Sequence, residues 1–210
     1  MKVNEIFLSI QGESLSSGFP TIFVRFTGCN LRCSYCDTTY SYNDGIDMTP
    51  ESIMKKIKKF HYNRVCLTGG EPLLQKDLDK LLKMLEGYIV SIETNGSVKL
   101  ECLDLLNRKY SFVLDIKTPS SRCSEKMVLN NFEFLEEKDE IKFVIEDRAD
   151  YEWSKDIIFK YHKKGVLTFS PVFGKVDYAK IVRWILEDRL NVRFQLQLHK
   201  LIWEPDMTGV

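Results

Sequence analysis

Two spacings of apolar residues recur along this chain and predict strands and helices in turn. Short apolar runs such as Ile89–Ile92 are typical of buried strands, and apolar residues three or four positions apart, as in residues 78–85, are typical of amphipathic helices. Strands are predicted at residues 3–10, 21–26, 65–68, 89–92, 112–117, 141–145, 166–170 and 192–198. Helices are predicted from Pro50 after the Thr49 cap, at 78–85, around 99–108, near 124–136, at 149–164 and after the Asp177 cap.

Strands that alternate with helices indicate parallel βαβ units. Glycine and polar motifs follow several of the predicted strands, and that edge of a parallel sheet is where α/β proteins place their sites. The pattern therefore predicts an α/β fold with a single domain, residues 1–210, built as a partial (β/α) barrel. A cysteine-rich loop near the N-terminus follows the predicted strand at 21–26.

Composition narrows the class of protein further. The 210 residues suit one domain, and 30 basic residues balance 30 acidic ones, so nothing indicates a nucleic-acid partner. No apolar run approaches the roughly 20 residues of a membrane span, and the N-terminus does not resemble a signal peptide. Six cysteines without such a signal favour the reducing cytoplasm.

Cys29, Cys33 and Cys36 bring three thiols into eight residues. Four thiolates usually close a structural zinc site, whereas three leave one iron of a 4Fe–4S cubane open to another ligand. Half of a zinc ribbon is an alternative, although no second cysteine or histidine pair follows at ribbon spacing. With the aromatic Tyr35 before the last cysteine, the string resembles the signature of the radical S-adenosylmethionine (radical SAM) superfamily. That resemblance implies a partial barrel of the radical SAM type and an open iron chelated by S-adenosylmethionine.

Three further motifs end predicted strands. Gly69-Gly70-Glu71-Pro72 begins 33 residues after Cys36, and Glu93-Thr94-Asn95-Gly96 and Asp115-Ile116-Lys117 follow at the next two strand ends. Alone, each is consistent with a turn or a helix cap. Together with the cysteines, the first matches the radical superfamily's pattern for holding the methionyl amine. Arg25 interrupts an apolar run, so it either extends outward to solvent or binds an anion inside.

A narrower resemblance covers residues 5–200. The strings at 5–13, 18–20 and 23–31, then Cys36-Asp37-Thr38 and Gln197-Leu198-His199-Lys200, resemble the 7-carboxy-7-deazaguanine synthase family. This resemblance implies a carbon–nitrogen lyase that converts 6-carboxy-5,6,7,8-tetrahydropterin to 7-carboxy-7-deazaguanine with loss of ammonia, on the route to queuosine. The radical comes from the cofactor, so no protein side chain is expected to be catalytic.

The same resemblance implies the roles of individual residues. The 4Fe–4S cluster is expected on Cys29, Cys33 and Cys36, and Mg²⁺ on Thr38. Contacts to S-adenosylmethionine are expected from Tyr35, Cys36, Asp37, Gly70, Glu71, Gly96, Asp115, Ile116 and Lys117. Contacts to the pterin are expected from Ile10, Gln11, Gly12, Glu13, Arg25, Thr94 and His199. The expected partners are a second copy of the chain and a one-electron donor such as flavodoxin or ferredoxin.

Two other functions fit parts of the pattern. A radical SAM activase that installs a glycyl radical on a partner protein shares the cysteine and Gly-Gly-Glu motifs, but it needs an open face for a polypeptide. Gln11, Glu13 and Arg25 instead suggest a closed pocket for a small molecule. A non-catalytic zinc-binding module is the other alternative, and an anaerobically purified zinc protein is colourless where an iron–sulfur protein is brown.

Overall fold

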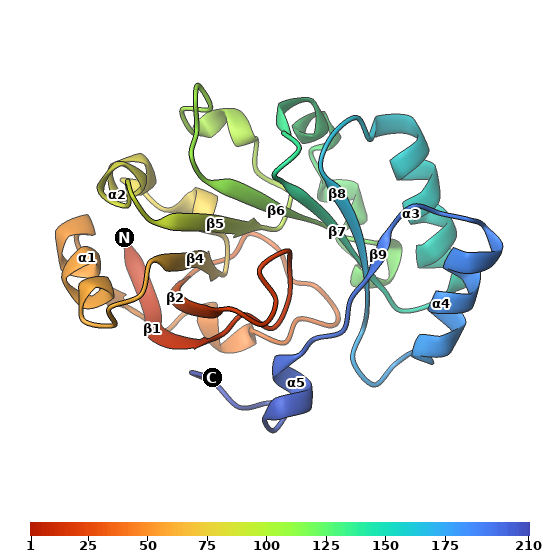
Figure 1. Cartoon of the computed structure of the whole chain (residues 1–210), viewed down its shortest axis with the longest axis horizontal. Helices are drawn as coiled ribbons and strands as arrows, with labels where there is room; N and C mark the ends of the chain where they lie inside the picture. Colours follow the sequence, from red (N-terminus) through yellow and green to blue (C-terminus); the bar gives the residue numbers. More distant parts are fainter.

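The computed structural model describes residues 1–210 and contains one nine-stranded sheet. Its strands are β1 (Lys2–Ile10), β2 (Pro20–Phe26), β3 (Ile46–Asp47), β4 (Arg64–Gly69), β5 (Ile89–Thr94), β6 (Ser111–Ile116), β7 (Glu140–Ile145), β8 (Val166–Pro171) and β9 (Arg193–Phe194). The spatial order is β3-β1-β2-β4-β5-β6-β7-β8-β9. From β2 to β9 all neighbours are parallel, and β1 joins β2 and β3 antiparallel. The sheet curves into the partial barrel that the sequence predicts (Figure 1).

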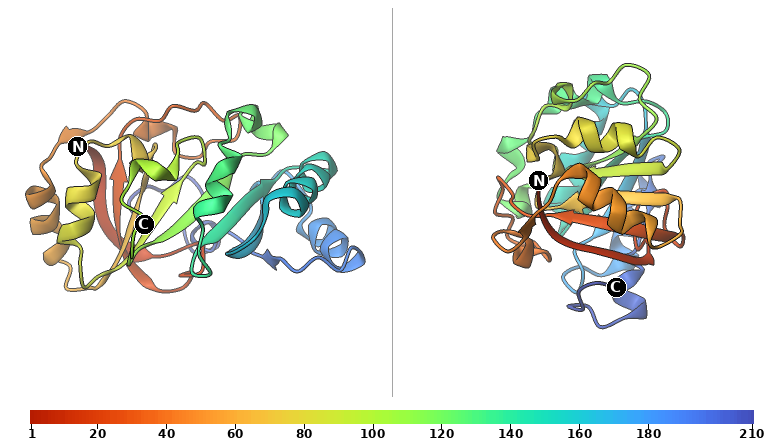
Figure 2. Two further views of the ribbon diagram at one scale, coloured as in Figure 1. Left: turned by 90° about the horizontal axis from the view of Figure 1, so that it is seen from above. Right: turned by 90° about the vertical axis from the view of Figure 1, so that its left-hand side faces the viewer.

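Four of the five α-helices cover the outside of the sheet. The helices are α1 (Pro50–Lys58), α2 (Leu78–Met84), α3 (Arg148–Tyr161), α4 (Tyr178–Glu187) and the short α5 (His199–Ile202). Short 3₁₀ turns lie at Thr39–Ser41, Pro72–Leu74, Leu100–Cys102, Pro119–Ser121, Ser124–Lys126 and Leu129–Phe134. Figure 2 shows α1 and α2 against the N-terminal half of the sheet and α3 and α4 against the C-terminal half.

The hydrophobic core lies between the sheet and these helices. Alternate strand residues such as Val24, Leu67, Ile92, Leu114 and Phe143 are fully buried on that side, where they meet the apolar stripes of the helices. Because side chains alternate along a strand, the intervening residues point to the concave side of the sheet. Those residues are largely polar or charged, so the two faces of one sheet serve different purposes.

Helix boundaries follow the capping residues that the sequence displays. The Thr49 hydroxyl accepts a hydrogen bond from the Ser52 amide at 3.2 Å, and Pro50 occupies the first helical position of α1. The Asp177 carboxylate accepts from the Ala179 amide at 2.9 Å at the start of α4. These local signals agree with the structure because each capping contact spans only two or three residues.

The predicted helix around 99–108 is wrong, and the segment holds only one 3₁₀ turn, Leu100–Cys102. The Leu106 amide bonds to the Asp104 carboxylate at 3.1 Å, a local contact that competes with helical bonding. Asn107 adopts a left-handed φ of 55°, and Arg108 turns into the protein. The region near 124–136, predicted as helical, forms two 3₁₀ turns instead of an α-helix.

The last predicted strand is shorter than 192–198, because β9 contains only Arg193 and Phe194. The chain leaves the sheet at Gln195, whose side chain bonds the Ser14 backbone twice. The Ser14 amide donates to Oε1 at 2.8 Å, and Nε2 donates to the Ser14 carbonyl at 2.9 Å. The loop after β1 therefore packs beside β9, the last strand of the sheet, and it partly closes the barrel.

A buried ion pair joins the starts of β6 and β7. Both side chains of Arg108 and Asp139 are fully buried and bond to each other through two guanidinium nitrogens. Asp139 also accepts from the Phe112 amide at 2.8 Å and the Glu136 amide at 2.7 Å, so both carboxylate oxygens have partners. This end of the sheet lies opposite the edge that carries the cysteine loop.

Asp139→Ala should reduce the free energy of unfolding by about 3–5 kcal/mol, because it leaves the buried Arg108 with only the half-exposed Glu136, 3.6 Å from its Nε, as a counter-ion. Urea denaturation measures the change. Glu133→Ala is the matched control, because Glu133 pairs with Lys163 at the surface and the loss should be much smaller. Equal losses in the two variants would show that burial does not set the strength of the Arg108 pair.

Candidate active site

The loop with the three cysteines is held to the end of β4 by close backbone contacts. The Gly70 amide donates to the Phe26 carbonyl at 3.0 Å, and the Glu71 amide donates to the Gly28 carbonyl at 2.8 Å. A Cβ atom on Gly70 would lie 2.0 Å from the Gly28 oxygen, so no larger residue fits there. The glycines of this motif place their backbone directly against the cysteine loop, a role that the sequence does not reveal.

Glu71 braces the next strand to this loop. Its carboxylate is fully buried and accepts from the Thr94 hydroxyl at 2.8 Å, the Leu73 amide at 3.0 Å and the Asn95 amide at 2.7 Å. Burial raises the pKa of Glu71, and these three donors oppose the rise. Both Glu71 and Thr94, predicted to contact ligands, are thus engaged with each other.

The three cysteines of the motif are half-buried, unlike the buried Cys66 and Cys123. The Cys29 sulfur accepts from the Leu31 amide at 3.4 Å and from the Asn95 side-chain amide at 3.5 Å. Burial raises the pKa of Cys29, against the effect of these two donors. Burial also raises the pKa of Cys33 to about 12, although the Lys117 ammonium opposes it.

Three thiols in one loop are the donor set of a cubane with one open iron. No three cysteine, histidine or carboxylate side chains converge on one metal position. In a cubane each thiolate binds a different iron, so its ligands need not converge as zinc ligands do. Cys123, which the sequence analysis did not connect with the motif, lies beside Cys33 and contributes to its raised pKa.

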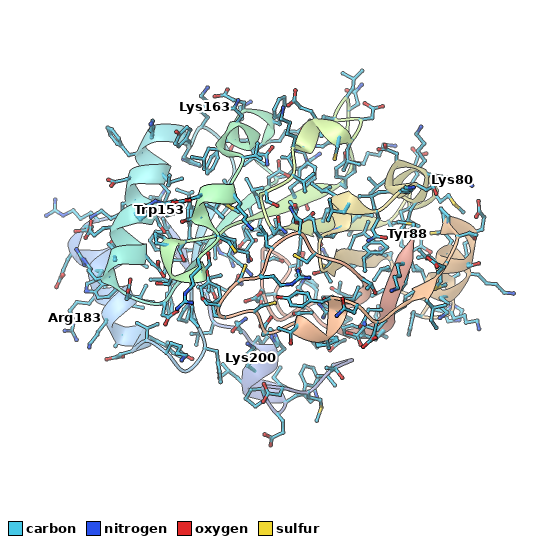
Figure 3. The ribbon with its side chains drawn as sticks, turned by 180° about the vertical axis from the view of Figure 1, so that it is seen from behind. Lys80, Tyr88, Trp153, Lys163, Arg183 and Lys200 are labelled. Atoms are coloured by element: carbon cyan, nitrogen blue, oxygen red, sulfur yellow. The ribbon has the colours of Figure 1, made fainter.

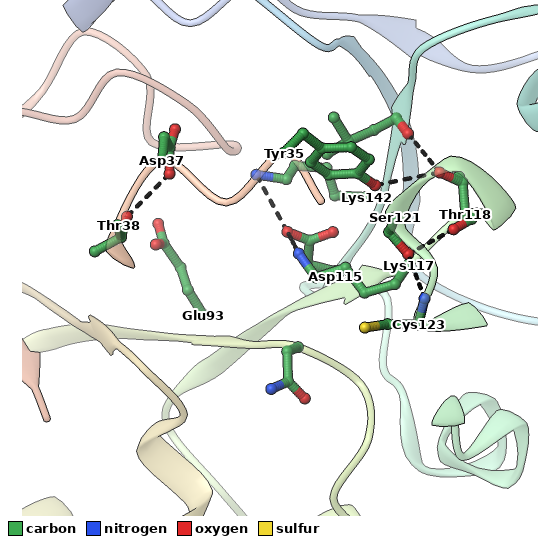
Figure 4. A network of polar contacts seen from close by, with 12 residues as sticks. Tyr35, Asp37, Thr38, Glu93, Asp115, Lys117, Thr118, Ser121, Cys123 and Lys142 are labelled. Atoms are coloured by element: carbon green, nitrogen blue, oxygen red, sulfur yellow. Dashed lines mark hydrogen bonds and ion pairs between the residues drawn. The ribbon is translucent and has the colours of Figure 1, made fainter. Parts of the chain in front are cut away.

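Residues predicted to contact S-adenosylmethionine gather next to the cysteine loop (Figure 4). Lys117 Nζ donates to Asp115 Oδ2 at 2.8 Å, and the Tyr35 and Thr118 hydroxyls lie 3.2 Å apart. Burial alone would lower the pKa of Lys117, but Asp115 and Tyr35 raise it, so the ammonium remains charged. Asp115 Oδ1 is buried and has no partner. Gly96 follows β5 with a left-handed φ of 74°.

Asp37 and Thr38 lie at the other side of this network (Figure 4). The Thr38 hydroxyl donates to Asp37 Oδ1 at 2.9 Å, and Lys200 Nζ donates to Asp37 Oδ2 at 2.8 Å. The Lys200 ammonium and the Thr38 hydroxyl hold the pKa of Asp37 below its usual value. The side chains of both residues therefore offer only oxygen atoms as possible metal ligands.

Arg25 points inward and not outward to solvent, the two orientations that the sequence left open. Its Nε donates to Glu5 Oε1 at 2.7 Å, Tyr40 donates to the same oxygen at 3.0 Å, and Glu5 is its cross-strand neighbour on β1. Burial lowers the pKa of Arg25, but Tyr40 and Glu5 outweigh that effect and raise it. The two Nη atoms make no hydrogen bond within the chain.

Gln11 and Glu13, from the loop after β1, meet charged residues of the concave face. Gln11 Nε2 donates to Glu93 Oε1 at 3.0 Å, and the Thr68 hydroxyl donates to Glu93 Oε2 at 2.8 Å. Glu13 Oε2 accepts from Lys142 Nζ at 2.8 Å, while its Oε1 is buried without a partner. Glu93 belongs to a strand-end motif of the sequence but was assigned no individual contact, and Lys142 was not predicted.

The C-terminal segment crosses this loop. The Leu198 amide donates to the Gly12 carbonyl at 2.9 Å, and a Cβ on Gly12 would lie 2.0 Å from His199 Nδ1. Burial lowers the pKa of His199, although Glu13 and Asp37 oppose it. The structure thus brings the predicted pterin residues Gly12, Glu13 and His199 together, and Ile10 ends β1 immediately before them.

Among the predicted residues, all but Ile116 and Ile10 have polar or close contacts within this region. Ile116 is fully buried in the apolar core, so only its backbone can face a ligand. Sequence reasoning assigned no contact to Glu5, Lys142 and Lys200, and it singled out Glu93 and Asn95 only as members of a strand-end motif. For Glu5, Glu93 and Lys142 the sequence signal is a charge within a predicted strand or at its end, whereas Asn95 and Lys200 lie outside the strands. Among the helices, none combines the length and the hydropathy of a membrane span.

Comparisons with known proteins agree with this geometry. The family model for the radical SAM superfamily matches residues 23–185. A 7-carboxy-7-deazaguanine synthase from Clostridium acetobutylicum is 43% identical over 218 residues, which cover 100% of this chain and 99% of the relative. One from Methanospirillum hungatei is 44% identical over 210 residues, 98% and 86% of the two chains. The crystal structure of QueE from Escherichia coli has a TM-score of 0.75 at 24% identity, covers 94% of each chain and shares the fold.

An α/β partial barrel with a three-cysteine loop at the carboxyl edge of its sheet defines a radical SAM protein, whose superfamily carries a 4Fe–4S cluster and S-adenosylmethionine. Within that superfamily, the chain belongs to the 7-carboxy-7-deazaguanine synthase family, the carbon–nitrogen lyases of queuosine biosynthesis.

Gly70→Ala should prevent stable loading of the cluster, because the added methyl group would displace the backbone of the cysteine loop at Gly28. Iron and sulfide content after anaerobic reconstitution measures the effect. Gly87→Ala is the control, because Gly87 has a positive φ of 94° but open space around its Cα, and this variant should load normally. Normal loading of Gly70→Ala would show that the close approach does not position the loop.

Proposed function

We propose that this chain converts 6-carboxy-5,6,7,8-tetrahydropterin to 7-carboxy-7-deazaguanine and ammonia, with Mg²⁺ beside the substrate carboxylate. The observation that supports this proposal most is a connected row of largely buried charges on the concave face. Glu13, Lys142, Asp115 and Lys117 follow one another along it, from the expected pterin loop to the expected cofactor segment. The names of the curated relatives point to the same reaction.

The proposed cofactor site uses Cys29, Cys33 and Cys36 for the cluster. When bound, the reduced cluster supplies the electron that cleaves S-adenosylmethionine to methionine and a 5′-deoxyadenosyl radical. The proposed S-adenosylmethionine contacts are Tyr35, Cys36, Asp37, Gly70, Glu71, Gly96, Asp115, Ile116 and Lys117. Since the Glu71 carboxylate is occupied, Gly70 and Glu71 contribute backbone atoms, and the free Asp115 Oδ1 offers an acceptor.

The proposed substrate site uses Ile10, Gln11, Gly12, Glu13, Arg25, Thr94 and His199. A pterin edge presents paired N–H donors, which the free Glu13 Oε1 can accept in a buried setting. The two Nη atoms of Arg25 can hold the substrate carboxylate as a bidentate pair. These residues bind and orient the ring and exclude water, and none of them needs to carry out the radical chemistry itself.

An anaerobic assay tests the proposed reaction. Cluster-loaded protein, S-adenosylmethionine, a reductant and the carboxylated pterin should give a product with the mass of 7-carboxy-7-deazaguanine. Cys33→Ala, which removes one cluster ligand, is the inactive control. Cleavage of S-adenosylmethionine without formation of the deazapurine would refute the proposed substrate.

Mg²⁺ is proposed to bind at the Thr38 hydroxyl. This cation prefers oxygen ligands and retains several waters. The Thr38 hydroxyl and the substrate carboxylate are therefore sufficient as its ligands other than water. Asp37, ionised beside Lys200, adds negative charge next to the site. Arg25 and the cation would share the substrate carboxylate and so align the carbon from which hydrogen is removed.

Thr38→Ala should retain the cluster and S-adenosylmethionine binding but lose the stimulation of turnover by Mg²⁺. A misplacement of about 1 Å can reduce a rate on the order of a hundredfold, which sets the scale of the expected loss. The readout is the initial rate of product formation as Mg²⁺ is titrated. Thr39→Ala, at the exposed neighbouring residue, is the control. A Thr38→Ala variant that still responds to Mg²⁺ like the wild type would exclude this ligand.

A homodimer is the proposed assembly, and a flavodoxin- or ferredoxin-type protein is the proposed electron donor. Exposed apolar side chains in the C-terminal segment, Leu201, Ile202 and Met207, support contact with a second copy. Light scattering should give about twice the 24.6 kDa chain mass. A monomer mass at every protein concentration would rule out the dimer.

A further inference from the structure

Lys142 lies between the residues proposed to bind the two small molecules. Its side chain extends from β7 to the concave face and is 12% exposed. Nζ donates to Glu13 Oε2 at 2.8 Å and lies 3.7 Å from Asp115 Oδ2. Asp115 is the cross-strand neighbour of Lys142 on β6, and Lys117 bonds to the same Asp115 oxygen. Figure 4 shows both lysine side chains directed at Asp115.

Each of the two carboxylates has one oxygen held and one oxygen free. Glu13 Oε1 and Asp115 Oδ1 are both buried, and neither has a hydrogen-bond partner. A buried acceptor without a donor is unfavourable by about 1–3 kcal/mol, more for a charged group. Lys142 contacts both carboxylates, and each carboxylate has one such unpaired oxygen. These two oxygens therefore indicate positions at which hydrogen-bond donors of a ligand bind.

The ion pair of Arg108 and Asp139 looks different. Asp139, at the opposite end of the sheet, uses both carboxylate oxygens and accepts from Arg108, Phe112 and Glu136. Lys142 leaves half of each carboxylate open. Burial lowers the pKa of Lys142, but Glu13 and Asp115 more than offset this and raise it well above its usual value, so the ammonium stays charged.

We infer that Lys142 is a positioning residue for the pterin: it fixes the Glu13 carboxylate so that Oε1 faces the substrate, and it links that carboxylate to Asp115. The inference rests on the proposed function, because it takes the pterin as the ligand of Glu13. A lysine suits this place since its ammonium is a compact point charge with three donors, which can serve two carboxylates at once.

The test is binding of 6-carboxypterin to anaerobic, cluster-loaded protein with S-adenosylmethionine present. This oxidised pterin lacks the hydrogen at C6, so binding is measured without turnover, through its fluorescence. Lys142→Met should weaken its affinity at least tenfold, and Lys142→Arg, which keeps the charge, should restore part of that loss. Lys163→Met is the matched control, because Lys163 forms an exposed ion pair with Glu133 on the outer surface (Figure 3). The affinity of this variant for 6-carboxypterin should stay within twofold of wild type.

A double-mutant cycle distinguishes positioning from a general structural effect. If Lys142 acts through Glu13, then Glu13→Gln/Lys142→Met should bind 6-carboxypterin within twofold of Glu13→Gln alone. In turnover assays, Lys142→Met should raise KM for the tetrahydropterin more than it lowers kcat. Should the Met variant fail to load the cluster, Lys142→Gln, which retains a donor, replaces it with the same expected loss.

Two results would overturn the inference alone. One is wild-type affinity for 6-carboxypterin in a folded, loaded Lys142→Met protein. The other is a double variant whose loss equals the product of the two single losses, because independent effects multiply in the binding constant. If the wild-type protein itself binds no carboxylated pterin, the proposed function fails, and this inference is refuted with it.

Discussion

The close approach of the β4 end to the β2 end is the constraint on which the site depends. Gly69 and Gly70 bring their backbone against Phe26 and Gly28, at distances that leave no room for a Cβ atom. This contact sets where the cysteine loop leaves the sheet. The Glu71 carboxylate then carries the constraint across to β5 through Thr94 and Asn95. One short motif thus couples three neighbouring strand ends, and Asn95 reaches back to the Cys29 sulfur.

The sheet separates stability from chemistry by its two faces. The outer face packs against helices and buries the aliphatic and aromatic core, which provides the main driving force for folding. The inner face carries charges that are unfavourable to bury unless they are paired. Asp139 has partners for both carboxylate oxygens, whereas Glu13 and Asp115, at the cysteine edge, each keep one free oxygen. These free oxygens support the proposal that the cysteine edge of the sheet is the binding site.

Local patterns predicted those elements whose stabilising contacts are themselves local. The Thr49 and Asp177 caps bond to residues two or three positions away, and the strands from 21–26 to 166–170 follow continuous apolar runs. The segments that failed involve distant partners in addition to local ones. Leu100 bonds to Asn131 where a helix was expected, and Gln195 bonds to Ser14, which ends β9 after two residues. Apolar spacing contains no information about such contacts.

The sequence by itself determined the alternation of strands and helices, the three-cysteine loop and the family, because each of these is encoded in neighbouring residues. It also indicated Gln11, Glu13, Arg25, Asp115 and Lys117 as site residues through family resemblance. Only the tertiary structure decided which charges pair. Glu13 meets Lys142 across 129 positions, and Arg25 turns inward to Glu5. An inward strand position can be predicted from a period of two, but its partner depends on strand register and barrel curvature, which exist only in the folded chain.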